Sequence, residues 1–180
     1  MEALTGRPPD LSGRLDKEKR VYDLLDRLDV SYQRADHPPL MTMAARAEVE
    51  RLFQAIVCKN LFHRDARGSH FYVLDILGDK RFKTSDISRQ IGSSRLSFAP
   101  AEDLERLLDI APGSVSVLGL MNDRENQVQL LLDRAVPEDE FLLCHPCVNT
   151  SSLKLRSKDL MEKILPALRH QPVFVHVAAD

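Results

Sequence analysis

The feature that most restricts the fold is a pair of apolar runs separated by a short polar turn. Residues 55–65 (AIVCKNLFHRD) and residues 70–77 (HFYVLDIL) are rich in β-branched and aromatic side chains, which favour strands over helices. The segment between them, ARGS, is typical of a hairpin turn. A hairpin in the middle of the chain predicts a sheet with antiparallel pairing.

Helices and strands alternate along the rest of the chain. Apolar spacing and capping residues predict helices over residues 17–28, 43–53, 85–91, 101–110 and 158–170. Extended structure is predicted over residues 30–34, 95–98, 115–120, 127–132, 140–144 and 173–177. Because these elements follow no regular βαβ repeat, we expect one mixed α/β domain whose sheet is largely antiparallel.

Length and charge narrow the class of protein. A chain of 180 residues fits one domain, with residues 1–15 as a loosely ordered lead-in and residues 16–180 as the folded part. A net charge of −2 excludes a bulk polycation, so a nucleic-acid partner would need a local basic patch. No apolar run approaches the ~20 residues of a membrane span, and no signal peptide begins the chain. We therefore expect a soluble cytoplasmic protein without membrane contact.

One lysine interrupts the first of the two apolar runs. Lys59 lies between Val57 and Leu61 in a segment that otherwise reads as a buried strand. An ammonium group among apolar neighbours either extends to the surface or lies in a cleft that awaits an anionic or carbonyl partner. Both interpretations of Lys59 stay open at this point.

The cysteines offer a competing hypothesis. Cys144 and Cys147 have the C-x-x-C spacing of redox pairs and of metal ligands. The residues that follow do not read as a helix, which such a redox pair needs, and there is no second C-x-x-C for zinc. We therefore expect no metal and no cofactor, and three cysteines fit a reducing compartment.

Four segments in series resemble one known family. They are His37-Pro38-Pro39 with Thr42, Lys59-Asn60-Leu61-Phe62 with Arg64-Asp65, Pro112-Gly113-Ser114-Val115-Ser116 with Leu120 and Asn122-Asp123, and His145-Pro146 with Val148-Asn149-Thr150. In this order, the chain resembles the free-standing prolyl-tRNA editing deacylases, which are relatives of the YbaK proteins and of the editing domain inserted into bacterial prolyl-tRNA synthetases. The resemblance covers residues 17–177. It implies a mixed sheet curled into a barrel-like core with surrounding helices, and hydrolysis of the ester that joins a wrong amino acid to tRNA.

The resemblance also implies which residues form the site. Lys59 is expected to hold the terminal adenosine or to polarise the ester, and Gly113 to begin a loop whose backbone approaches the substrate. His145 is expected to face the same cleft, although a lone histidine is more often structural. The residues expected to bind substrate are Thr42, Asn60, Phe62, Ser114, Val115, Ser116, Val117 and Asn149.

The chain departs from the family at one position of this loop. Relatives commonly have Gly, three residues and then Pro, whereas here Val117 occupies the fifth position. Valine leaves the backbone freer than proline and restores an N–H group, which puts substrate choice in doubt.

The expected function is a deacylase that acts in trans on mischarged tRNA for proline. Alanine is the first choice of amino acid and cysteine the second, and a catalytically weak tRNA-binding member of the family is the alternative. The expected partners are the 3′-terminal adenosine and the acceptor stem, with transient contact to prolyl-tRNA synthetase. Arg46, Arg51, Arg64 and Arg67 are candidates for phosphate contact. The sequence does not fix the oligomeric state.

Overall fold

The predicted hairpin lies near one edge of a five-stranded sheet. In the computed structural model, which describes residues 1–178, β3 (Cys58–Arg64) and β4 (Phe71–Leu77) pair antiparallel along their whole length. The short strand β5 (Ser97–Phe98) pairs antiparallel with the outer edge of β3. Beyond β4 follow two parallel neighbours, β6 (Val128–Asp133) and β9 (Val173–Val175). The strand order is therefore β5-β3-β4-β6-β9.

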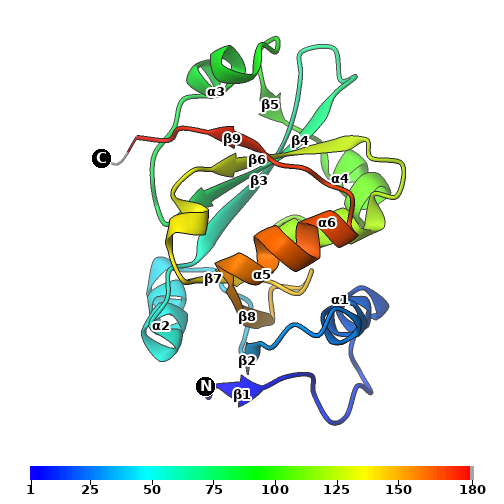
Figure 1. Ribbon diagram of the computed structural model, residues 1–180, viewed down its shortest axis with the longest axis vertical. Helices are drawn as coiled ribbons and strands as arrows, with labels where there is room; N and C mark the ends of the chain where they lie inside the picture. Colours follow the sequence, from blue (N-terminus) through cyan, green and yellow to red (C-terminus); the bar gives the residue numbers. More distant parts are fainter. Residues whose placement is uncertain (179–180) are drawn as a thin grey trace.

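A second sheet of four strands lies below the first in Figure 1. It is antiparallel throughout and contains β1 (Leu4–Thr5), β2 (Gln33–Asp36), β8 (Ser151–Arg156) and β7 (Phe141–Cys144), in that order. A single parallel bridge between Val57 and Leu143 links the two sheets. The mixed α/β class is confirmed, but the strands of residues 1–178 form two sheets and no closed barrel.

Helices cover both sheets. The longer ones are α1 (Asp16–Arg27), α2 (Met43–Phe53), α3 (Thr84–Ile91) and α4 (Ala101–Leu108). A C-terminal helical segment comprises α5 (Ser157–Asp159), the π-helical turn η3 (Leu160–Ile164) and α6 (Leu165–Ala167). A short 3-10 turn, η2 (Val136–Glu138), precedes β7. In Figure 1, α1 and α2 flank the lower sheet and α3 lies at the top of the upper one.

Several sequence expectations are confirmed at the level of single residues. The Thr42 hydroxyl accepts a hydrogen bond from the Ala45 amide at 3.1 Å and so caps α2. Gly92 ends α3 with a φ of 69°, in the left-handed region that glycine adopts readily.

Within residues 1–15, expected to be loosely ordered, Leu4 and Thr5 form β1 against β2. The last two residues of the predicted domain lie outside the described part of the chain.

The alternation of side chains along β4 divides the interior into two apolar clusters. Val73 faces the larger cluster, to which α1, α4 and the C-terminal helical segment contribute. Leu74 and Ile76 face the opposite way and pack with Ile87 of α3. Because strand residues alternate between faces, both sides of the five-stranded sheet are covered and its central strands are buried.

One predicted strand is wrong. Residues 115–120 were expected to be extended, but residues from 117 onward form the 3-10 helix η1 (Val117–Asn122). The Ser116 hydroxyl accepts a hydrogen bond from the Leu118 amide at 3.2 Å and starts the helix. Val117, Leu118 and Leu120 are all buried, so this run has no solvent-exposed side. Periodicity cannot distinguish a strand from a helix in such a segment.

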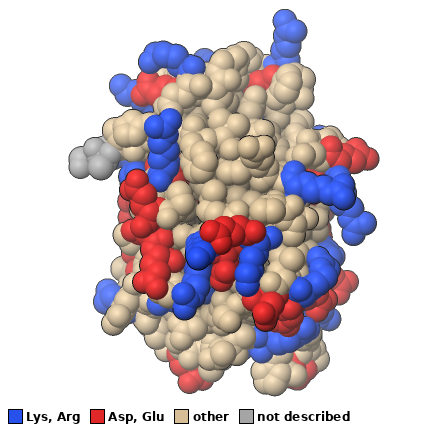
Figure 2. Space-filling model, viewed as in Figure 1, with Lys and Arg blue, Asp and Glu red and all other residues tan. Residues whose placement is uncertain are grey.

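The charged surface agrees with the small net charge of the sequence. On the face shown in Figure 2, lysine and arginine side chains are interspersed with aspartate and glutamate around a broad uncharged area. In the part of the chain that the structure describes, no helix combines the length and the apolar character that crossing a bilayer requires.

The packing of η1 yields a test of the fold. A Cβ atom on Gly119 would lie 2.3 Å from Cδ1 of Ile110, so Gly119→Ala should lower the free energy of unfolding by about 1–3 kcal/mol through overpacking. Ile110→Val removes that Cδ1 atom. In urea denaturation, the double variant should therefore be less destabilised than the sum of the two single changes. Additive effects would contradict this close packing.

Candidate active site

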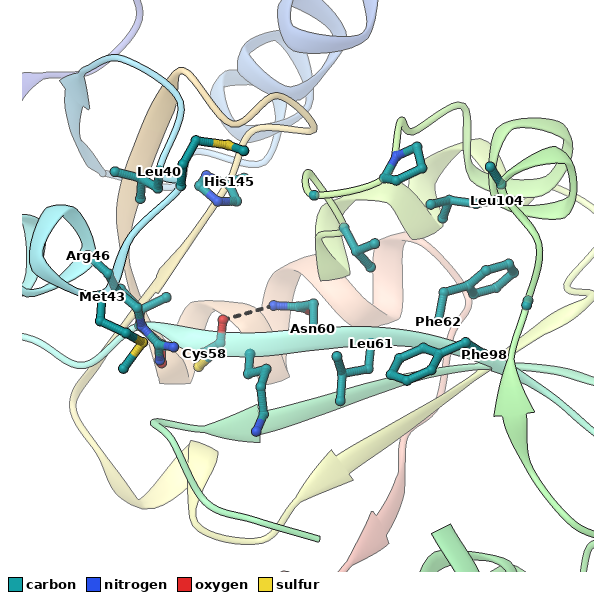
Figure 3. A pocket seen from close by; sticks show the side chains of 18 of the residues that line it. Leu40, Met43, Arg46, Cys58, Asn60, Leu61, Phe62, Phe98, Leu104 and His145 are labelled. Carbon is teal, nitrogen blue, oxygen red and sulfur yellow. Dashed lines mark hydrogen bonds between the residues drawn. The ribbon is translucent and has the colours of Figure 1, made fainter. Parts of the chain in front are cut away.

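A cavity of about 560 Å³ opens where β3 lacks a neighbouring strand. β5 pairs with β3 only at His63 and Arg64, and the isolated bridge to β7 is at Val57, before β3 begins. The stretch of β3 between these two contacts has an open edge, and the cavity lies against it. The other walls come from the loop before α2, the start of α4, the loop around Gly113, and His145 (Figure 3).

The open edge presents main-chain hydrogen-bonding groups to the cavity. The Phe62 carbonyl accepts a hydrogen bond from the Ala99 amide at 3.0 Å, so the main-chain groups of Phe62 point away from β4. In an antiparallel pair these groups alternate in direction from residue to residue. The N–H and C=O groups of Asn60 therefore point to the same edge, where no strand pairs with them among the described residues. A ligand in the cavity can bond to them.

Side chains from both faces of β3 reach the cavity. Figure 3 shows Asn60 and Phe62 on the side of His145 and Leu104, with Leu61 and Phe98 on the opposite side of the strand. Strand alternation places Lys59 on the same face as Leu61. The cavity therefore extends around the edge of β3, with Asn60 on one face and Lys59 on the other.

Lys59 combines the two interpretations that the sequence left open. Its side chain is half-buried and lines the cavity. The Nζ atom donates a hydrogen bond to the Lys80 carbonyl at 2.8 Å and lies 5.6 Å from the centroid of the Phe82 ring. The methylene stem thus passes along apolar surface while the ammonium group is held at a defined position beside the cavity.

His145 presents one ring nitrogen for chemistry. Its Nδ1 atom lies 2.8 Å from the Ser151 carbonyl, which can only accept, so Nδ1 carries the proton and donates. Burial lowers the pKa of His145, and the nearby His37 ring contributes in the same direction. The imidazole is therefore neutral near pH 7, and its Nε2 atom keeps a lone pair that can accept a hydrogen bond.

The structure brings most of the predicted site residues to one cavity. Those that line it are Thr42, Lys59, Asn60, Phe62, Gly113, Val115 and His145. Ser114 and Asn149 instead line a second cavity, of about 500 Å³, beside the first. Ser116 and Val117 are buried and line neither cavity.

Gly113 lines the first cavity and lies close to Asn149, which lines the second. It has a φ of +87°, and a Cβ atom placed on it would lie 3.9 Å from Nδ2 of Asn149. The space around this residue would accept a methyl group, so the backbone conformation is what requires glycine.

Several cavity residues were not predicted from the sequence. Met41, Met43 and Phe98 line the cavity with 81%, 65% and 68% of their surface exposed. Large exposed apolar side chains at the rim of a cavity are a recognised sign of a binding surface. Met41 and Met43 lie around the start of α2, and Phe98 belongs to a strand of two residues. Neither segment has a periodic apolar pattern that would have indicated these residues in the sequence.

Two of the candidate phosphate-binding arginines have protein partners. Arg46 lies at the cavity, where it contacts Asp79 at 2.6 Å and the Val57 carbonyl at 3.0 Å. Arg64 contacts Asp103 at 3.3 Å. Arg46 therefore fixes α2 against the start of β3, which shapes the cavity wall.

The three cysteines lack the properties of reactive thiols. Cys58, Cys144 and Cys147 are free and buried, and burial raises the pKa of each thiol, that of Cys147 to about 12. Reactive cysteines need a lowered pKa. The residues after Cys147 form a turn and then β8, so neither cysteine of the pair opens a helix. Within residues 1–178, no group of three His, Cys, Asp or Glu side chains could hold a metal ion.

A buried carboxyl group lies behind the cavity. Asp75 of β4 is the register partner of Asn60, has no exposed surface, and has no hydrogen-bond partner of normal geometry for either oxygen. Burial, assisted by the charge of Asp133, raises the pKa of Asp75 to about 7, and the nearby Cys58 thiol offsets only part of this. The sequence did not indicate the raised pKa of Asp75, because this residue is simply one polar position within a predicted strand.

Comparisons with known proteins agree on one family. Residues 37–163 match the family model described as the aminoacyl-tRNA editing domain. The prolyl-tRNA editing protein ProX of Acetoanaerobium sticklandii is 30% identical over 85% of this chain and 93% of its own length. The prolyl-tRNA synthetase associated domain-containing protein 1 of Danio rerio is 27% identical over 89% of this chain and 88% of its own.

The fold matches a solved structure as well. A crystal structure described as a candidate trans-editing enzyme for prolyl tRNA synthetase superimposes with a TM-score of 0.66. The match covers 91% of this chain and 99% of the other, at 16% identity. At that identity the match supports the fold alone.

The buried carboxyl group yields a pH-dependent prediction. Because the pKa of Asp75 rises from 3.8 to about 7 on folding, its contribution to stability is complete below about pH 4 and is lost as the pH rises towards 8. Asp75→Asn cannot titrate. At pH 8 it should therefore exceed the wild type in free energy of unfolding, by up to about 4 kcal/mol at 1.4 kcal/mol per pKa unit.

Denaturation at pH 5 and pH 8 checks this expectation. The exposed residue Asp16 offers the matched control, because Asp16→Asn makes the same substitution at the surface. Equal pH profiles for Asp75→Asn and the wild type would mean that Asp75 is ionised in the folded protein.

Proposed function

The chain belongs to the aminoacyl-tRNA editing domain family, and from this premise we propose that it clears mischarged tRNA for proline in trans. Family membership and the aminoacyl-tRNA deacylase class, both expected from the four sequence segments, are confirmed. The more specific proposal rests on the cavity at the open edge of β3. A neutral His145 and the main chain of Asn60 both lie at this cavity.

The proposed chemistry is the attack of water on an ester carbonyl. Such a site must orient the water, stabilise negative charge on the carbonyl oxygen and hold the amino acid. The Nε2 atom of His145 is an acceptor that can orient the water, take up its proton and return it to the ribose oxygen when the ester C–O bond breaks. The N–H group of Asn60 at the open edge is a donor for a substrate oxygen. Lys59, on the other face of β3, is assigned to the nucleotide end of the substrate.

Alanine is the proposed amino acid, with cysteine as the second candidate. A synthetase pocket shaped for proline discriminates poorly against smaller amino acids, because one missing methylene is worth only about 1–3 kcal/mol. A second, smaller site can hydrolyse the esters of the smaller amino acids that the synthetase pocket accepts. The apolar side chains Phe62, Leu104 and Val115 line the cavity and pack with the larger apolar cluster, and they suit a small side chain.

The alternative is a tRNA-binding protein with weak hydrolysis, which the departure at Val117 suggested. Val117 is the first residue of η1 and follows the extended residue Ser116. Proline is favoured at the first position of a helix, so this site suits the proline that relatives have. The valine changes the stiffness of the loop that carries Val115 and leaves the cavity lining itself intact, which favours the hydrolase.

The proposed partners follow from the substrate. The 3′-terminal adenosine and the acceptor stem would contact this protein, with transient contact to prolyl-tRNA synthetase after release of the mischarged tRNA. A cytoplasmic location follows from the same substrate.

Deacylation by the purified protein tests the function. We expect it to speed the release of alanine from tRNA for proline, and to act less on the cysteinyl ester. Lys59→Ala should slow hydrolysis at least ~10²-fold, because it removes a contact that positions the nucleotide end of the substrate, while stability changes by about 1 kcal/mol or less. Lys19→Ala on α1, away from the cavity, is the control and should retain full activity.

Two results would contradict the assignment. Failure of the wild type to release either amino acid, with a ProX-type relative active in parallel, would remove the proposed function. Full activity of Lys59→Ala would remove Lys59 from the site and leave the function in place.

Substitution of Val117 tests where the amino acid binds. Val117→Pro fixes the backbone of the loop that carries Val115, without a change of charge. We expect stability near that of the wild type and a changed ratio of hydrolysis rates for alanyl and cysteinyl esters. Rate constants for both esters check this, and an unchanged ratio would place the amino-acid pocket elsewhere.

A further inference from the structure

Phe98 has an unusual position at the cavity. It belongs to β5, which pairs with the edge of β3 where the open stretch ends, and 68% of its surface is exposed. Figure 3 shows its ring beside Leu61, on the face of β3 opposite to Asn60 and Phe62. Phe98, Met41 and Met43 are three large apolar side chains exposed around one cavity, and such a grouping marks a surface that a ligand covers.

The Phe98 ring is supported from behind by another ring. The imidazole of His63 stacks on it, with the ring centroids 4.6 Å apart and the planes inclined by 24°. His63 is 1% exposed. Its ring is also nearly perpendicular to that of Phe82, with the two ring centroids 6.0 Å apart. Neither nitrogen of His63 has a hydrogen-bond partner of normal geometry, and burial lowers its pKa to about 4, which the nearby main chain of Leu61 offsets only in part. His63 therefore acts as an uncharged aromatic wall that holds Phe98 in place.

The two faces of β3 match the two ends of an aminoacyl nucleoside. The His145 and Asn60 face suits the ester, as proposed above. The other face carries Leu61, Phe98 and the ammonium group of Lys59. A ribose at the open edge between them would direct its base to the Phe98 face, and Lys59 would supply positive charge for the adjoining phosphate.

We infer that Phe98, backed by His63, is the stacking platform for the terminal base of the tRNA. This inference rests on the proposed function and deepens it, because it assigns the nucleobase to a residue that the sequence analysis did not select. Aromatic side chains bind bases of single-stranded nucleic acid in this way, through the π-face. The unpaired 3′ end of tRNA offers such a base.

The test compares two acceptor minihelices of tRNA for proline, one intact and one with an abasic terminal residue. The wild type should bind the intact minihelix about 5- to 150-fold more tightly, the range expected for one stacked base. Phe98→Leu keeps apolar bulk but removes the aromatic face, so it should lose most of this preference. Phe98→Trp should retain it. The control is Phe174→Leu, a half-exposed phenylalanine on β9 at the opposite edge of the same sheet.

The outcomes separate this inference from the proposed function. If Phe98→Leu keeps the wild-type preference for the intact minihelix, or weakens both minihelices equally, the stacking role is wrong even where alanine is released normally. If the wild type shows the base-dependent preference and Phe98→Leu abolishes it while no ester is hydrolysed, the stacking role stands and the hydrolase proposal fails.

Discussion

The site depends on a strand that ends early. β5 contributes only two residues to the edge of β3, and the bridge from β7 touches the chain just before β3 begins. Between these contacts the main-chain groups of Asn60 have no strand partner. Unpaired strand edges are usually covered or shielded, because they attract other chains. Here the loop around Gly113, the start of α4 and the segment before α2 surround the edge, so only a ligand of limited size can reach it.

An edge site differs from a site on the face of a sheet. The alternation of side chains places Asn60 and Phe62 on one face and Lys59 and Leu61 on the other, so a ligand at the edge meets both sets. A single lysine within an apolar strand can then lie outside the apolar core and still belong to the cavity. This explains why Lys59 lines the cavity while its ammonium group bonds to the Lys80 carbonyl.

The sequence predicted the elements more completely than it predicted the site. The hairpin, the cap at Thr42 and most helices were accessible because they depend on local patterns. The strand predicted over residues 115–120 failed because that run is buried on every side. Phe98 and Asp75 were not predicted as site residues, because their roles depend on contacts between distant segments. Ser116 and Val117 belong to the expected loop, but the turn into η1 directs them to the core.

Burial makes two histidines neutral but leaves them with different capabilities. His145 donates through Nδ1 to the Ser151 carbonyl, so its tautomer is fixed and Nε2 remains as an acceptor on a residue that lines the cavity. His63 has no hydrogen-bond partner of normal geometry at either nitrogen, and its ring packs against those of Phe82 and Phe98. An unsatisfied imidazole costs free energy, and an apolar ring at this position would avoid that cost. The stacking contact with Phe98 needs only the flat ring, whereas the role assigned to His145 needs the nitrogen itself. The same residue type therefore supports two parts of the cavity through different properties.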